Sequence, residues 1–138
     1  MEAQEFVFDA KSDDSSFPPG SAIIQWHETG NKGSLIGGCD MRISGQQIKS
    51  YMEAAGFVNV QIIEMKWPMS PWSDDPKLRD AGQWLKSAMM KSEGGDLAGT
   101  SLAIFTRYLG WTIEELEALL AKVEKEWQRD DIHGYWPL

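Results

Sequence analysis

Two histidines, His27 and His133, are the side chains of this sequence best suited to acid–base chemistry. The pKa of an imidazole lies near neutrality, so either residue could act as a general base. The two lie far apart in the chain, and nothing in the sequence identifies a partner for either of them. A structural or surface role is the more common one for a histidine, so we assign no catalytic residue.

Acidic pairs and glycines are the next candidates for a chemical role. Three Asp-Asp pairs lie in predicted loops or next to a strand, where capping or solvation is more common than metal ligation. These pairs are Asp13–Asp14, Asp74–Asp75 and Asp130–Asp131. Gly37–Gly38 has neither the lysine nor the following helix of a phosphate loop, and no serine lies in a nucleophile elbow. The sequence therefore predicts no metal site.

The chain is rich in large, adaptable apolar side chains, with seven tryptophans and seven methionines. Such residues suit a core, a subunit interface or a pocket for a hydrophobic small molecule. Trp67, Trp111 and Trp127 fit packing positions, whereas three other tryptophans lie beside loops. These three tryptophans, together with one histidine and one tyrosine, suit a substrate-lining role. These predicted lining residues are Trp26, His27, Trp72, Tyr108 and Trp136.

Composition limits the class of protein. A chain of 138 residues with 42% hydrophobic and 25% charged residues is typical of one globular domain. The net charge of −8 opposes binding to nucleic acid or to an anionic membrane, and no apolar run approaches the length of a membrane span. The single Cys39 excludes an internal disulfide. We expect a cytoplasmic protein, with the nucleus as the alternative.

The stretch from Ile43 to Pro68 is the best defined element, a helix followed directly by a strand. Ser44 and Gln47 form a capping box, and Gly56 suits the left-handed residue that ends a helix. Residues 57–67 are then rich in β-branched and aromatic side chains on both faces. This pattern predicts a strand that is covered on both sides.

Weaker elements precede this stretch. Residues 2–8 read as a short strand, and residues 9–20 as a loop. Ser21 can cap a short helix that fades at Gly30. Residues 31–40, with three glycines, predict a flexible connection.

Three helices and the start of a strand follow it. Asp75 and Pro76 begin a helix that Gly94–Gly95 ends. A second helix covers residues 97–109 and ends at Gly110, and a third begins at a capping box of Thr112 and Glu115. Its buried stripe comprises Leu116, Leu119, Leu120, Val123 and Trp127. Residues 132–138 predict the start of a last strand, so the chain has few strands for a complete sheet.

Several motifs resemble the C-terminal half of a fungal group of class I S-adenosylmethionine-dependent methyltransferases. The group includes regulators of secondary metabolism and methyltransferases of biosynthetic clusters. The resemblance covers nearly the whole chain and keeps the spacing of several rare residues. Its motifs are residues 43–60, Lys66–Trp72, Asp75–Leu78, Gly82–Trp84, Phe105–Trp111 and Ile132–Pro137.

This resemblance implies an α/β, Rossmann-like fold that is only part of a class I methyltransferase domain. Residues 1–138 would form a single partial domain with the first four strands missing. Residues 2–8, 57–67 and 132 onward would be its fifth, sixth and antiparallel seventh strands. Residues 70–130 would be a helical insertion between the last two strands, on the acceptor side of the active site.

The sequence also departs from the family pattern. The family has a glycine-rich loop after its first strand and an acidic residue after its second, and neither occurs here. We therefore carry over no cofactor-binding residue, and we expect the isolated chain to bind S-adenosylmethionine only when an N-terminal half completes it. The partner would be that half or a second copy of the chain.

Three interpretations of function remain open from the sequence. The first is a segment of a methyltransferase that supplies the acceptor-side walls. The second is a stand-alone protein that binds a hydrophobic metabolite, for instance as a cofactor-free cyclase that holds its substrate in a reactive conformation. The third is a non-enzymatic, dimeric interaction module.

Overall fold

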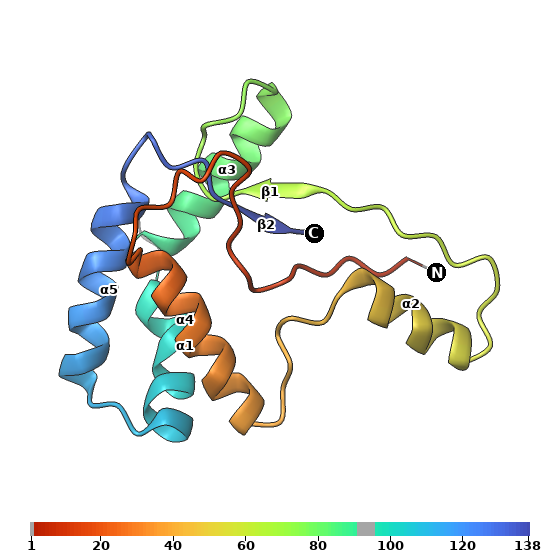
Figure 1. Cartoon of the computed structure of the whole chain (residues 1–138), viewed down its shortest axis with the longest axis horizontal. Helices are drawn as coiled ribbons and strands as arrows, with labels where there is room; N and C mark the ends of the chain where they lie inside the picture. Colours follow the sequence, from red (N-terminus) through yellow and green to blue (C-terminus); the bar gives the residue numbers. More distant parts are fainter. Residues whose placement is uncertain (1, 91–95) are drawn as a thin grey trace.

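Helices form most of the regular structure in the computed structural model, which describes residues 2–90 and 96–138 (Figure 1). Two short strands, β1 and β2, accompany them. The order is α1 (Ala22–Ile36), α2 (Gly45–Ala54), β1 (Lys66–Pro68), α3 (Pro76–Met89), α4 (Leu97–Ala103), the π-helical η2 (Ile104–Tyr108), α5 (Ile113–Trp127) and β2 (Tyr135–Pro137). Among the helices of these described ranges, none has the length and apolar character needed to cross a membrane.

The helix ends follow their local sequence closely. The predicted capping boxes of α2 and α5 both form, and Asp75 caps α3 with Pro76 at its first position. Gly56 has a φ of +94°, and its N–H donates to the Glu53 carbonyl at 3.0 Å. Side chains with a Cβ resist this conformation, so the predicted role of Gly56 is confirmed. The predicted helix end at Gly94–Gly95 lies outside the described residues.

Helix α1 is longer than the sequence predicted, since it continues through Gly30 to Ile36. The predicted fade at Gly30 and the flexible connection of residues 31–40 are therefore wrong over most of that range. Close packing explains the difference, because a Cβ at Gly33 would lie 2.6 Å from the Ile104 side chain. The glycines let α1 approach η2, and this tertiary contact outweighs their low helix propensity.

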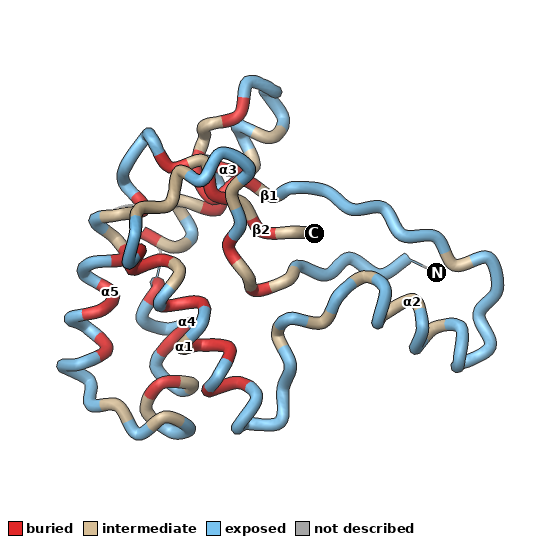
Figure 2. The backbone as a smooth tube through the Cα atoms, in the orientation of Figure 1, coloured by how far each residue is buried: buried red, intermediate tan, exposed pale blue. Residues whose placement is uncertain are grey.

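The core lies between α1, α4, α5 and the two strands, where buried residues gather in Figure 2. The predicted buried stripe of α5 is confirmed at all of its positions. Its last member, Trp127, donates its indole N–H to the Met69 carbonyl at 2.6 Å. The Glu126 carboxylate accepts from the backbone N–H of Ala22 at 2.7 Å, which joins α5 to the first turn of α1.

The sheet consists of β1 and β2 in antiparallel register, with Trp67 opposite Trp136. On its other side, β2 accepts a hydrogen bond from Val7 at 2.8 Å and forms an isolated bridge with Lys11. The predicted strand at residues 2–8 is wrong, because these residues make single contacts with β2 and no ladder. The described chain is thus mostly helical with a two-stranded sheet. Of the predicted α/β fold, the described residues show only this small sheet and the helices.

The long strand predicted at residues 57–67 is also wrong in extent and in burial. Only Lys66 and Trp67 of that range belong to β1, and no backbone hydrogen bond joins residues 58–64 to the rest of the described chain. Val58 is 81% exposed and Ile63 is 80% exposed. Helix α2 and this segment form an arm that extends from the core (Figures 1 and 2). The apolar pattern is present, but the described residues leave most of it exposed.

Gly82 of α3 offers a test of the packing between α3 and the chain after β1. A Cβ at this position would lie 2.2 Å from the Ser70 carbonyl oxygen. Gly82→Ala should therefore destabilise the fold by about 2 kcal/mol, although alanine is the better helix former. The measurement is the urea midpoint. Asp80→Ala, an exposed control on the same helix, should stay within about 0.5 kcal/mol of the wild type; equal midpoints for both variants would contradict the contact.

Candidate functional site

His27 lies inside the core on α1, with only 1% of its surface exposed. Its Nδ1 lies 2.8 Å from the Ile23 carbonyl oxygen, and its Nε2 lies 2.7 Å from Nε1 of Trp136. A carbonyl oxygen only accepts a hydrogen bond and an indole N–H only donates one. The proton of His27 is therefore on Nδ1, and the imidazole is neutral with both nitrogens engaged.

Electrostatics agree with this assignment. Burial lowers the pKa of His27 to about 4, the Ile23 carbonyl partly opposes this shift, and the positive charge of Arg42 adds to it. The Trp136 N–H also faces the position that a second proton would take. The imidazole thus stays neutral at pH 7, and its contacts are those of a structural core residue.

The two other predicted residues near His27 line a small cavity. Trp26 is 2% exposed and Trp136 is 1% exposed, and both border a space of about 180 Å³ whose lining also includes the exposed Phe6 and Thr100. The Trp26 indole N–H donates to Ser101 Oγ at 2.9 Å, and Ser101 Oγ donates to the Leu97 carbonyl at 2.8 Å. The polar atoms beside the two indoles are thus already paired within the chain.

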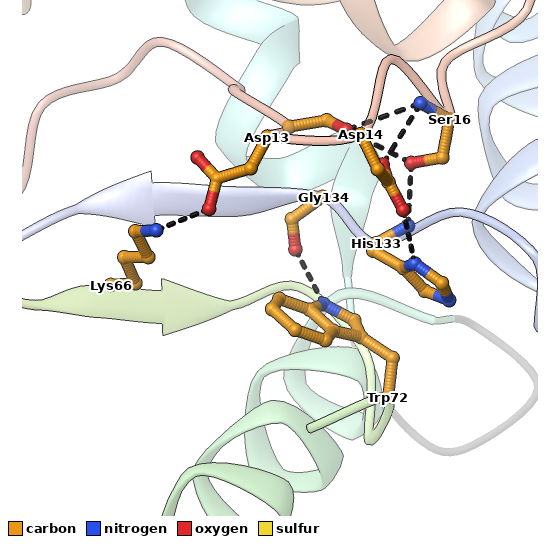
Figure 3. Close-up of polar contacts among 8 residues, drawn as sticks. Asp13, Asp14, Ser16, Lys66, Trp72, His133 and Gly134 are labelled. Carbon is orange, nitrogen blue, oxygen red and sulfur yellow. Dashed lines mark hydrogen bonds and ion pairs between the residues drawn. The ribbon is translucent and has the colours of Figure 1, made fainter. Parts of the chain in front are cut away.

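A second group of side chains lies at the surface, and Figure 3 labels all of its members except Tyr135. We call it the outer cluster; it comprises Asp13, Asp14, Ser16, Lys66, Trp72, His133 and Tyr135. His133 pairs with the Asp14 carboxylate through Nδ1, and its backbone N–H donates to Ser16 Oγ at 2.8 Å. Trp72 donates to the Gly134 carbonyl at 2.8 Å, and its ring centroid lies 5.4 Å from that of His133.

The carboxylates of the outer cluster are held in the ionised form. Hydrogen bonds from Ser12, Ser16 and His133, in that order of effect, keep the pKa of Asp14 far below its usual range. Lys66 and Tyr135 similarly lower the pKa of Asp13. An ionised carboxylate that accepts from Nδ1 orients an imidazole, which is the arrangement of a general base. No local sequence pattern indicates that Asp14 and His133 form a pair, because they lie at opposite ends of the chain.

The five predicted lining residues therefore lie in three places. Trp26, His27 and Trp136 meet in the core, whereas Trp72 belongs to the outer cluster. Tyr108, at the end of η2, is 44% exposed, and its ring covers Gly37, where a Cβ would lie 2.8 Å from it. The structure thus joins three of the five, and their contact with a substrate stays a prediction.

A larger groove of about 640 Å³ lies between the N-terminal segment, α2 and residues 57–65. Its walls include exposed apolar side chains, such as Val58 and Ile63. The described part of the chain contains no group of three or more His, Cys, Asp or Glu side chains that could hold a metal ion. The groove therefore provides exposed apolar surface.

Comparisons with known proteins identify relatives along the whole chain. It is 27% identical to the "Probable methyltransferase tdiE" of Emericella nidulans over 100% of the chain and 42% of that protein. It is 31% identical to "Methyltransferase pytC" of Aspergillus terreus over 97% of the chain and 40% of that protein. The "Secondary metabolism regulator laeA" of Aspergillus fumigatus is 28% identical over 98% of the chain and 35% of that protein.

The chain is therefore homologous to the fungal proteins tdiE, pytC and laeA, which confirms the predicted resemblance. It spans well under half of the length of each of these relatives. No protein-family model matches the chain, and neither does any solved structure.

Proposed function

We propose that this chain, a homologue of fungal methyltransferases, is one part of an S-adenosylmethionine-dependent methyltransferase of secondary metabolism. The similarity to tdiE and pytC over 97–100% of the chain is the observation that supports this function. In this proposal the chain supplies acceptor-side walls. Binding of the cofactor belongs to the part of the relatives outside the aligned 35–42%.

The described residues do not fit the cofactor by themselves. Class I cofactor binding needs backbone N–H groups of a glycine-rich loop at the start of a helix, together with a carboxylate for the ribose. Gly37–Gly38 instead follows the C-terminal end of α1, where carbonyl groups point outward. We derive no catalytic step through the cofactor, and the role proposed for this chain is to hold the acceptor and to exclude water.

The groove is the proposed docking site for the complementary part. The pattern of residues 57–67 predicts a strand that is covered on both faces, yet residues 58–64 have no backbone partner in the described chain. Unpaired backbone next to exposed apolar side chains favours pairing with another strand. A second copy of the chain is the competing occupant, and it is an outcome of the association test in the Discussion.

The chain alone is expected to bind no S-adenosylmethionine, because none of its described glycine pairs opens a helix. Isothermal titration calorimetry of the purified chain should give only heats of dilution, with full-length pytC as the positive control. Micromolar affinity in the isolated chain would place a cofactor site within these 138 residues and would contradict the proposed division of roles.

A further inference from the structure

A cavity of about 180 Å³ lies where the N-terminal segment, α1, α3, α4, η2 and β2 meet. Three aromatic side chains, Trp26, Phe105 and Trp136, border its inner part, and each is at most 2% exposed. Met89 and the exposed Thr100 border its outer part. The space is therefore walled by rigid rings inside, and the adaptable Met89 side chain lies at its outer part.

We propose that this cavity binds one small, uncharged, flat ring of a size between benzene and indole. Volume gives the first argument. An engineered cavity of about 150 Å³ in another protein, lined by apolar side chains, stays dry and binds benzene. The present cavity is slightly larger, so a single ring or a fused pair of rings matches its capacity.

The state of the polar atoms gives the second argument. The indole N–H of Trp26 is bound to Ser101, that of Trp136 is bound to His27, and the Ser101 hydroxyl is bound to the Leu97 carbonyl. No indole N–H of the inner wall is thus left for a ligand. A charged ligand would lose its hydration without gaining an ion pair or a hydrogen bond from these groups, which costs several kcal/mol or more. The walls therefore favour an apolar, uncharged guest.

The arrangement of the rings gives the third argument. Phe8 and Trp26 pack edge to face, with centroids 4.9 Å apart, and both border the cavity. Aromatic faces and edges attract a further flat ring beyond the effect of buried area. In addition, Ile104 and Phe105 border the cavity from η2. Its π-helical turn is a rare geometry that occurs frequently at functional sites.

This inference goes beyond the proposed methyltransferase role, because it requires neither the cofactor nor a second polypeptide. A ring bound here could be part of an acceptor molecule or of another apolar metabolite. The shared chemistry is the flat apolar ring, and the test below uses the chain alone without S-adenosylmethionine. Its failure would leave the proposed function untouched.

The test is a titration of the isotopically labelled chain with benzene and indole, followed through the NMR signals of the tryptophan Nε1–H groups. We expect saturable shifts of the Trp26 and Trp136 signals. Trp84, which is 76% exposed on α3, should not shift and serves as the reference. Benzylamine, a ring with a positive charge, should bind much more weakly than benzene.

Two variants at the outer part of the cavity make the test specific. Thr100→Phe places a ring in the space and should weaken binding at least about tenfold. Thr100→Val keeps the size of the side chain and should bind as the wild type does. Thr100 is exposed, so both variants should fold. Absence of saturable binding, equal binding by Thr100→Phe, or equal shifts at Trp84 would each overturn the proposal.

Discussion

Acidification from pH 7 to pH 4 is expected to lower the free energy of unfolding by about 3 kcal/mol through His27 alone. The folded-state pKa of His27 is about 4, against an ordinary value of 6.5. Between these values the unfolded chain binds a proton that the folded chain excludes. The stabilising contribution is thus complete above pH 6.5 and is lost as the pH falls toward 4.

The matched variant for this prediction is His27→Gln, which keeps a donor for Ile23 and an acceptor for Trp136 but does not titrate. Urea unfolding at pH 7, 5.5 and 4 should show a steeper loss of stability in the wild type than in the variant. The carboxylates with a lowered pKa, such as Asp13, change the free energy of unfolding mainly below their ordinary pKa of 3.8. The change between pH 7 and pH 4 is therefore assigned to His27. Parallel pH profiles for wild type and variant would show that His27 is not buried in the neutral form.

The second large effect concerns association through the groove. At micromolar concentration and without a complementary part, we expect the chain to form a symmetric dimer rather than a 15.5 kDa monomer. The groove side chains Val58 and Ile63 are 81% and 80% exposed. Burying each in an interface contributes about 1.5–3 kcal/mol. Sedimentation equilibrium measures the mass directly.

A double variant, Val58→Asp with Ile63→Asp, should weaken this association by about a hundredfold or more. Trp84→Asp is the matched control, because Trp84 is a large exposed apolar residue on α3, outside the groove. A wild-type chain that sediments as a monomer would show that the groove has no affinity for a second copy. Dissociation by the Trp84 variant alone would place the interface elsewhere.

Local features of the fold could be predicted because they depend on neighbouring residues. The capping boxes of α2 and α5 and the left-handed Gly56 need only a few adjacent positions, and all were predicted correctly. The apolar stripe of α5 was also correct, since a 3.6-residue period defines one face of a helix. Such a pattern indicates which face of an element is apolar, but not which other part of the protein packs against that face.

Features that depend on distant residues could not be predicted. Helix α1 passes Gly30 because η2, far along the chain, packs against it. Residues 57–67 have the pattern of a covered strand, yet the described chain leaves most of them uncovered. The pairs His27–Trp136 and Asp14–His133 join opposite ends of the sequence. No local signal specifies these contacts. The division of the predicted lining residues between core and surface depends on them, so it could not be predicted either.

The most direct test of the proposed function is a chimera in which this chain replaces its aligned segment in pytC. The account predicts that the purified chimera binds S-adenosylmethionine in a calorimetric titration, whereas this chain alone does not. The Val58→Asp, Ile63→Asp chimera should lose most of that binding, because its two parts no longer dock. A folded chimera without affinity for the cofactor, or cofactor binding by this chain alone, would contradict the account.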